Sequence, residues 1–352
     1  MFRSKTVFVV GAGASNEVNL PTGNDLKGRI AQALDIKFDH WTQMTGDRRI
    51  AHFFREYVKL DADRHGNINP LLKKCWQIRD VMPVAAISID NYIDAHRGDK
   101  DLELCGKLGI VKCILDAESS SKLKFKESSE RYDLPELQDT WYMSFLRMLT
   151  EGVSRDDVGS IFDNLSIITF NYDRCIEHFL PQALADLYNL SLSDMQLLVG
   201  KLRIYHPYGQ VGPLPWQDRQ NGIAYGYNEW ADLLVIAEKI KTFTEGMHSG
   251  RDLSPIRQFV AQAETIVFLG FAFHAQNLEL ISPDIPMATR RIFATVKGIS
   301  HSDEQEIVRD LKRMHISSNI GGSEYKEPKV SLLNDTCNSL FHHFWRSLPA
   351  AA

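Results

Sequence analysis

Short apolar runs separated by longer polar and helical stretches are the main pattern along this chain. Five of the runs are rich in β-branched or aromatic residues, which is typical of buried strands. They are Thr6–Val10, Ser166–Phe170, Leu202–His206, Thr265–Gly270 and Arg291–Val296, and a sixth lies near Lys329–Leu333. Buried strands that alternate with helical sequence predict an α/β fold, a Rossmann-like doubly wound parallel sheet.

The connection between the first two runs is about 155 residues long, far more than one crossover helix requires. Apolar and charged residues recur at helical spacing in Arg48–Lys59, Pro70–Asp80 and Leu134–Thr150. The pattern therefore predicts a helical insertion subdomain over residues 35–159 that caps the sheet, with the sheet domain formed by residues 1–34 and 160–345.

Two shorter segments carry local signals. Residues 119–131 (SSSKLKFKESSER) are polar and rich in serine, which predicts a flexible surface loop. Ser302, with Gln305 three positions later, predicts a capping box at the start of a helix that runs to about Met314.

Composition narrows the function classes. The chain has 352 residues, 44% of them hydrophobic, and a formal net charge of −5, which argues against direct sequence-specific nucleic-acid binding. Its five cysteines form no C-x-x-C pair, so the sequence indicates neither a metal site nor a disulfide framework. No apolar run approaches the roughly 20 residues of a membrane span, and the first strand begins too early for a signal peptide. These features favour a cytoplasmic protein.

The first strand ends in a glycine turn, Gly11-Ala12-Gly13-Ala14-Ser15. Glycines here let a phosphate approach backbone N–H groups at the start of a helix. The third glycine of the dinucleotide fingerprint is absent, because position 16 is Asn. A tight turn that packs a helix close to a strand explains the glycines as well, so the turn alone does not decide the function.

Polar residues follow two further strands, in Thr169-Phe170-Asn171-Tyr172-Asp173 and in Tyr205-His206-Pro207. In open α/β sheets ligands bind beyond the carboxyl ends of the strands, so we expect Asn171, Asp173 and His206 to meet the glycine turn in one crevice. An amide there can hold water or a ribose hydroxyl, and a histidine can exchange protons. Alternatively, Asn171 and Asp173 cap the following helix, and His206 is a semi-buried structural histidine.

These motifs together resemble the sirtuin-like proteins, in particular the divergent bacterial branch that hydrolyses NAD in anti-phage defence. The matching segments are VFVVGAGAS, NLPTGNDL at 19–26, SIITFNYDRCIEHF at 166–179, YHPYGQVG at 205–212 and IVFLGFAFHAQNLELI at 266–281. The resemblance implies roles for individual positions. It assigns Gly11, Ala12, Gly13 and Ser15 to the phosphates, Thr169, Asn171 and Asp173 to the nicotinamide-ribose side, His206 to the catalytic pair, and Gly270 and Asn277 to the adenosine end.

Three departures separate the chain from sirtuin deacylases. It lacks the two C-x-x-C pairs of their zinc ribbon, it has Leu20-Pro21-Thr22-Gly23 in place of a Gly-Ile-Pro-x-Phe-Arg segment, and Pro207 follows the histidine where the family has glycine. Deacylation is therefore not expected. A hydride-transferring Rossmann enzyme is disfavoured as well, because no acidic residue ends a second strand about 20 residues after the glycines; Asp35 follows a helix-like stretch.

The resemblance implies an NAD glycohydrolase that releases nicotinamide and a linear or cyclic ADP-ribose, with NAD as substrate and no metal. Asn171, His206 and Asp173 would carry the reaction. Such an enzyme would deplete NAD in defence, gated by homo-oligomer assembly or by a partner such as a translocase-type ATPase encoded nearby. The alternative is a sensor or scaffold that binds NAD or an ADP-ribose derivative without turnover.

Two features remain open at this point. The aromatic residues Trp216, Tyr225, Tyr227 and Trp230 suit either a lid over a flat ring or core packing. The segment Ser88–Tyr92 in the insert suits either a helix cap or a position at which Asp90 faces the cleft.

Overall fold

A six-stranded parallel sheet organises the computed structural model, which describes residues 1–40, 42–60, 62–125, 131–227, 233–241, 253–317 and 327–351. The strands are β1 (Thr6–Val10), β4 (Leu165–Thr169), β5 (Arg203–Tyr205), β6 (Thr265–Leu269), β7 (Arg291–Thr295) and β8 (Lys329–Leu333). Their spatial order is β5-β4-β1-β6-β7-β8, which is the order of dinucleotide-binding Rossmann folds. All six expected strands are present, within one residue of their predicted ends.

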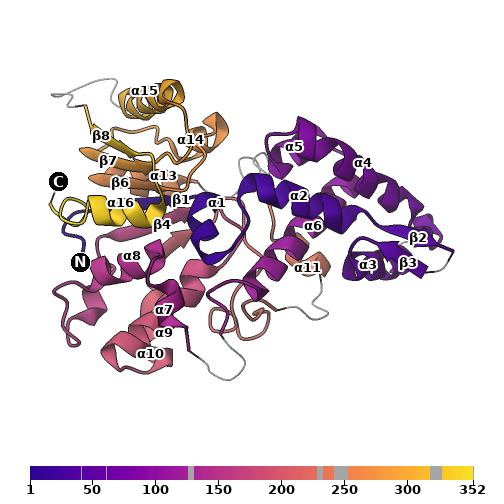
Figure 1. Cartoon of the computed structure of the whole chain (residues 1–352), viewed down its shortest axis with the longest axis horizontal. Coiled ribbons are helices and arrows are strands. Elements are labelled where there is room, and N and C mark those ends of the chain that lie inside the picture. The colour runs from indigo at the N-terminus through magenta and orange to yellow at the C-terminus, as the bar shows by residue number, and fades with distance from the viewer. Residues whose placement is uncertain are drawn as a thin grey trace.

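Alternate residues of each strand enter two separate cores. Val7 and Val9 of β1 face one core, and Phe8 and Val10 face the other. One face is covered by α8 (Trp141–Thr150), α9 (Cys175–Tyr188) and α16 (Cys337–His343), and the opposite face by α13 (Ser254–Gln262), α14 (Ala275–Ile281) and α15 (His301–Ser317). Figure 1 shows these helices on both sides of the strands, so the sheet is doubly wound as predicted.

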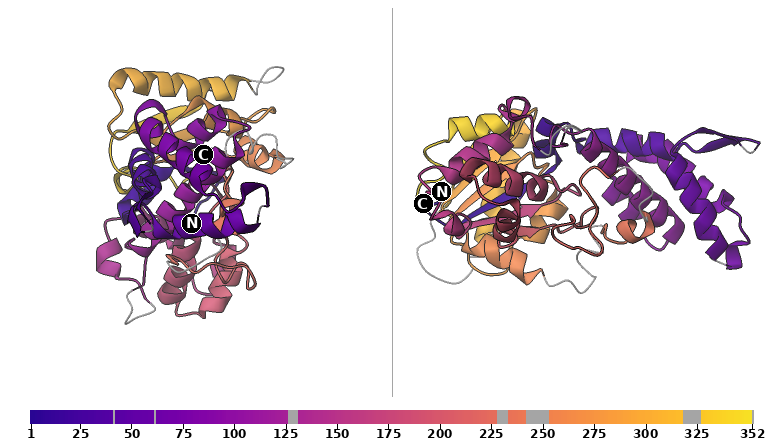
Figure 2. Two further views of the ribbon diagram at one scale, coloured as in Figure 1. Left: turned by 90° about the vertical axis from the view of Figure 1, so that its right-hand side faces the viewer. Right: turned by 90° about the horizontal axis from the view of Figure 1, so that it is seen from below.

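A helical lobe extends from one end of the sheet (Figures 1 and 2), whereas both chain termini lie close together at the other end. The lobe contains α2 (Gly23–Leu34), α3 (Arg48–Leu60), α4 (Asn69–Ala85), α5 (Ile89–Ala95) and α6 (Lys100–Ser119), together with an antiparallel pair, β2 (Lys37–Asp39) and β3 (Thr42–Thr45). The helices α3 and α4 contain two of the three segments predicted as helical, and the third, Leu134–Thr150, is divided into two helices, Leu134–Leu137 and Trp141–Thr150. The β2–β3 pair was not anticipated.

Packing revises the boundary between the two parts of the chain. Helix α2, which the sequence placed with the sheet, packs on α6 so closely that a Cβ at Gly109 would lie 2.8 Å from Ile30. Helix α8, which the sequence placed in the insert, buries Trp141 and Phe145 in the core that contains Phe8. Amphipathic spacing predicts that a helix packs, but the surface it meets depends on the path of the whole chain.

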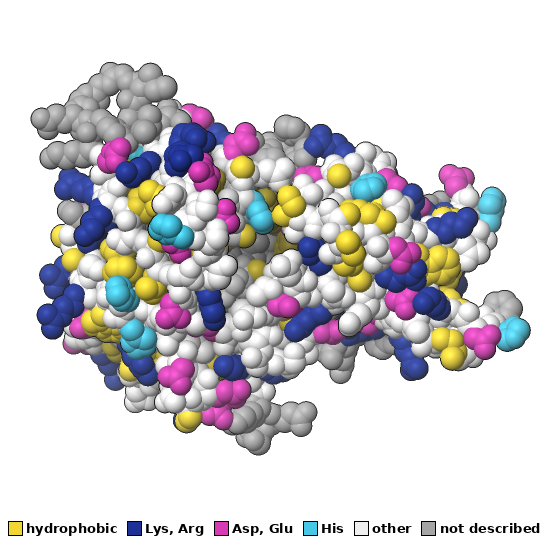
Figure 3. Space-filling view, turned by 45° about the horizontal axis from the view of Figure 1, so that its top comes forward, with side chains coloured by type: hydrophobic (Ala, Val, Ile, Leu, Met, Phe, Trp, Pro, Cys, Tyr) yellow, Lys and Arg dark blue, Asp and Glu magenta, His cyan; other side chains and the backbone are white. Residues whose placement is uncertain are grey.

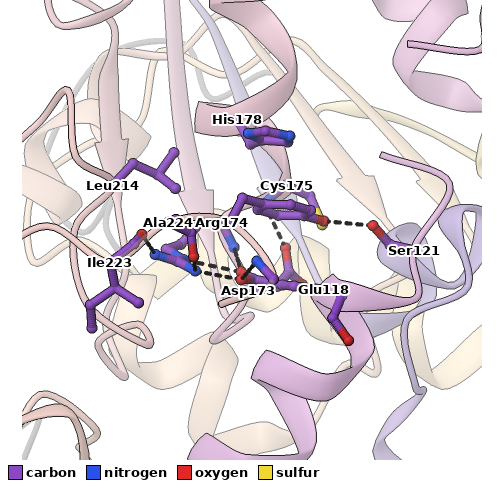
Figure 4. Close-up of polar contacts among 12 residues, drawn as sticks. Glu118, Ser121, Asp173, Arg174, Cys175, His178, Leu214, Ile223 and Ala224 are labelled. Atoms are coloured by element: carbon purple, nitrogen blue, oxygen red, sulfur yellow. Dashed lines mark hydrogen bonds and ion pairs between the residues drawn. The ribbon is translucent and has the colours of Figure 1, made fainter. Parts of the chain in front are cut away.

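A buried ion pair joins the lobe to the sheet (Figure 4). Glu118, near the end of α6, and Arg174, directly before α9, are both 0% exposed, and the Arg174 Nε donates to Glu118 Oε1 at 3.1 Å. The Arg174 guanidinium also donates to the carbonyl oxygens of Ile223 and Ala224. Three segments that are distant in sequence therefore meet at one charged contact.

The segment after α6 differs from its prediction as a flexible surface loop. Ser121 and Leu123 are buried, and the Ser121 hydroxyl lies 3.0 Å from that of Tyr225. Tyr225 is itself buried and stacks on His178 at 3.9 Å between ring centroids, so it belongs to the core and not to a lid. Residues 126–130 and Trp230 lie outside the described residues.

Helix α15 begins one residue before the predicted cap. Ser300, and not Ser302, accepts a hydrogen bond from the Asp303 N–H at 3.2 Å, and the Asp303 carboxylate accepts one from the Ser300 hydroxyl at 2.9 Å. The predicted box was therefore wrong by two residues, because two serines near the helix start offer the same local pattern.

The remaining elements are short connectors. They are α1 (Ala12–Ser15), α7 (Leu134–Leu137), α10 (Leu192–Val199), α11 (Leu233–Ala237) and the 3₁₀ turns η1 (Asn16–Val18), η2 (Ala62–Arg64) and η3 (Val158–Ser160). Figure 3 shows acidic and basic side chains interspersed over one face of the molecule. Within the described ranges, no helix has the length and apolar character that crossing a membrane demands.

Candidate nucleotide-binding site

A cavity of about 1020 Å³ lies at the carboxyl ends of the central strands. Its wall contains residues that directly follow β1, β4, β6 and β7, and residues from the lobe. The wall residues that directly follow these four strands include Gly11–Gly13, Phe170, Asn171, Gly270–Ala272 and Val296–Gly298, and the lobe adds Gly23, Asn24, Ile87, Ser88, Asp90 and Asn91. The volume is at the upper end for small-molecule sites, and the position is the crevice where the strand order reverses between β1 and β6.

The glycine turn after β1 forms part of the wall, but its two glycines are in close contact with the loop that follows β6. The N–H groups of Gly11 and Gly13 donate to the carbonyl oxygens of Leu269 and Gly270 at 2.9 and 3.0 Å. A Cβ at Gly11 would lie 2.6 Å from the Gly270 oxygen. The glycines are therefore required for close contact between two loops, and these two N–H groups are not available to a phosphate.

Asn171 lines the cavity, and its side-chain amide points toward the glycine turn after β1. Its Nδ2 donates to the Gly11 carbonyl at 3.2 Å and to the Ser15 hydroxyl at 3.0 Å, and its backbone N–H donates to the Thr169 hydroxyl at 3.2 Å. Because both side-chain amide protons are used in this way, the group that Asn171 offers to a ligand is its side-chain carbonyl oxygen, Oδ1. That oxygen can accept a hydrogen bond from a sugar hydroxyl or from water.

His206 lies outside the wall of this cavity, although the sequence grouped it with Asn171. Its Nδ1 is 3.0 Å from the backbone carbonyl oxygen of Asn171, and its Nε2 is 2.7 Å from the Glu177 carboxylate. Its side chain is 9% exposed and lies between two other hollows, of about 450 and 710 Å³. Burial opposes protonation of His206, but the Glu177 carboxylate outweighs burial and raises the pKa of the imidazole. The histidine thus ties the end of β5 to α9 and to the backbone of Asn171.

Asp173 is buried behind the wall and serves the start of α9. Its Oδ1 accepts a hydrogen bond from the Cys175 N–H at 3.1 Å, and burial raises the pKa of its carboxyl. Asp173 lies one residue before Arg174, the N-cap position of α9, so its side chain bonds the first helical N–H without occupying the N-cap position that the sequence left open for it. Ser15 and Thr169 are also buried and lie outside the wall, and each forms a hydrogen bond with Asn171.

The structure therefore brings together part of the expected set. The expected residues that line the cavity are Gly11, Ala12, Gly13, Asn171, Gly270 and Asn277, and those outside its wall are Ser15, Thr169, Asp173 and His206. Asn277 accepts a hydrogen bond from the Tyr208 hydroxyl, which places the start of α14 beside the segment that follows β5.

Several wall residues were not singled out from the sequence, among them Lys297 and Tyr208. Lys297 follows β7 and supplies a positive charge, and Tyr208 follows β5. The rule that ligands meet the carboxyl ends of parallel strands would have found Lys297 if it had been applied to the fifth strand. Asp90, for which the sequence left two possibilities, takes both: Ser88 caps α5 by accepting from the Asn91 N–H at 3.1 Å, and Asp90 lines the cavity.

The five cysteines are buried and unbridged. Among the residues that the structure describes, no three His, Cys, Asp or Glu side chains form a group that could hold a metal ion. Comparison with protein-family models and with curated proteins finds no match to this chain.

Proposed function

We propose that this protein binds NAD in the cavity and hydrolyses its nicotinamide–ribose bond. The observation that carries the proposal is the meeting of the glycine turn and Asn171 in one cavity, at the reversal point of a Rossmann strand order. Dinucleotides bind across this crevice in folds of the same strand order. The resemblance of the strand-end motifs to NAD-hydrolysing sirtuin-like proteins supports NAD over other dinucleotides.

In the proposed complex, Lys297 and the backbone after β1 lie on the pyrophosphate side and the Asn171 carbonyl faces the ribose that carries nicotinamide. The departing base is a neutral pyridine, so the reaction requires positioning and charge stabilisation more than a strong acid. His206 and Asp173 act as positioning residues, because the contacts of His206 with the Asn171 backbone and of Asp173 with α9 hold Asn171 in place.

The positions of His206 and Asp173 also favour a second candidate, which is binding of NAD or ADP-ribose without turnover. Two of the three residues expected to carry the reaction lie outside the cavity wall. Equilibrium dialysis with NAD, followed by analysis of the bound fraction, distinguishes the two functions: unchanged NAD indicates a binding protein and nicotinamide indicates an enzyme.

The direct test is release of nicotinamide from NAD by the full chain, measured over protein concentrations that span its assembly states. We expect Asn171→Ala to lower the turnover by about 100-fold or more, since it removes the carbonyl that orients the ribose or water. Exposed Asn221, outside the cavity wall, provides the matched control, and Asn221→Ala should retain full activity. Circular dichroism checks that Asn171→Ala is folded, and the absence of release at every concentration overturns the enzymatic proposal.

Free hydrolysis of NAD would deplete the cell that makes this protein. We therefore place the activity under control by self-assembly or by a partner, as the resemblance to defence effectors implies. Activity that rises with oligomer size on a calibrated column would support self-assembly as the control, and constant activity across sizes would point to a partner.

A further inference from the structure

The helical lobe places one carboxylate in the wall of the cavity. Asp90 lies in the first turn of α5, and the hydroxyl of Tyr172 donates a hydrogen bond to its Oδ1. Tyr172 directly follows Asn171, so Asp90 reaches the same end of the cavity as the amide that we assign to the ribose. The segments after β1 and β8 also contribute the carboxylates of Glu17 and Asp335 to the wall, and Asp90 is the carboxylate that the lobe adds and that the residue next to Asn171 holds.

The groups around Asp90 leave its carboxylate ready to accept a proton. The titratable side chains that face it in the described part of the chain are Asp94 on the same helix, Tyr172 after β4 and Tyr208 after β5. The pKa of Asp90 is raised to about 6, mainly by burial and to a smaller extent by the charge of Asp94, while the Tyr172 hydrogen bond partly opposes the rise. An acid of this kind is ionised at neutral pH and still basic enough to take a proton from water.

We propose that Asp90 is the general base of the reaction, a catalytic residue that the helical lobe supplies to the site on the sheet. This inference rests on the proposed NAD hydrolysis. The water oxygen forms a bond to the anomeric carbon of the ribose as the bond from that carbon to the pyridinium nitrogen breaks. The bonding pair goes to the nitrogen, neutral nicotinamide leaves, and a water proton passes to Asp90 and then to solvent.

A purely structural role explains fewer of the contacts. Ser88 already caps α5, and the packing of α5 on α6 comes from apolar side chains such as Ile93, which lies against Gly106. Neither contact needs a carboxylate in the cavity. A carboxylate held only for helix stability would gain more from solvent than from burial beside the hydroxyl of Tyr172.

The test is the pH dependence of nicotinamide release by the full chain. We expect kcat of the wild type to fall on the acid side with a midpoint near the pKa of Asp90, about 6. Asp90→Asn should lower kcat by about 100-fold to 10,000-fold, with KM nearly unchanged, and should remove this acid limb. Tyr172→Phe should move the limb to higher pH, because it removes the hydrogen bond that stabilises the carboxylate.

Asp94→Asn is the matched control, since it makes the same change one turn along α5. It should keep the plateau of kcat and move the acid limb slightly to lower pH, because a neighbouring negative charge is lost. If Asp90→Asn keeps kcat within about twofold, or keeps the acid limb, Asp90 is not the base. Absence of nicotinamide release from the wild type would instead overturn the proposed function itself, and NAD binding by Asp90→Asn, measured by calorimetry, shows that the variant retains its site.

Discussion

At the scale of single residues, glycines determine how closely two loops of the cavity approach each other. Gly270 has a φ of +55°, and a Cβ there would lie 2.1 Å from the Ala14 nitrogen. A Cβ at Gly13 would lie 2.9 Å from the Gly270 Cα. Because both partners are backbone, no side-chain movement can relieve such contacts.

Gly13→Ala should therefore lower the free energy of unfolding by about 1–3 kcal/mol, as is usual when atoms are forced into a packed region. Gly28→Ala is the control. A Cβ at this position in α2 meets nothing within 4 Å, so the substitution should raise stability by about 0.5–1 kcal/mol. Urea unfolding followed by circular dichroism measures both, and equal stability of the two variants would contradict the close contact.

The directions of three strand-end side chains explain why only one of them lines the cavity. The strand-end rule placed Asn171, Asp173 and His206 at one edge of the sheet, and all three are found there. Only Asn171 lines the cavity, because Glu177 holds His206 and the Cys175 N–H holds Asp173. Both partners lie on α9. The contact of Asp173 is local and of the kind that the capping alternative described, whereas Glu177 lies 29 positions from His206 and no local pattern reveals that pair.

At the scale of elements, the ion pair between Glu118 and Arg174 connects α6 of the lobe to the start of α9. The Glu118 carboxylate also accepts hydrogen bonds from the N–H groups of Arg174 and Gly226, both at 3.1 Å. The charges are fully buried, so loss of either partner leaves an uncompensated charge in the interior. The pair thus fixes the orientation of α6 relative to α9 more than it adds net stability.

Glu118→Gln and Arg174→Met should each lower the free energy of unfolding by about 3–5 kcal/mol. The double variant should lose less than the sum of the two, since it leaves neither charge unpaired. Glu306→Gln is the control, because Glu306 pairs with Arg309 on the exposed face of α15 and should change stability by less than about 1 kcal/mol. Chemical unfolding of the four variants gives the values, and additive losses would contradict a direct coupling.

At the scale of the whole molecule, one core runs from the sheet into the lobe without a break. Val9 and Phe268 of the sheet belong to the same buried cluster as Ile30 of α2 and Ile78 of α4. Among the described residues, the lobe therefore shares its core with the sheet, even though it extends away from the sheet (Figure 2). The lobe and this face of the sheet are thus packed around one shared core.

We expect the sheet and the lobe to unfold in one cooperative transition. Native-state hydrogen exchange, followed by mass spectrometry at increasing denaturant, should give slow amides of β1 and of α6 the same opening free energy. Lower opening free energies throughout α3 to α6 would show that the lobe unfolds by itself. Amides of the exposed β2–β3 pair provide the internal control, since they should open locally at much lower cost.

The sequence by itself determined the set of strands, their doubly wound arrangement and the edge of the sheet where the cavity lies. These features depend on short-range patterns, namely buried runs, strand ends and glycine turns. Only the tertiary structure decided which strand-end side chains line the cavity, which helices belong to the lobe, and that Asp90 meets Tyr172 beside Asn171. Several of these outcomes depend on contacts between residues that are distant in sequence, such as Asp90 and Tyr172 at 82 positions or His206 and Glu177 at 29 positions, and no local period encodes them.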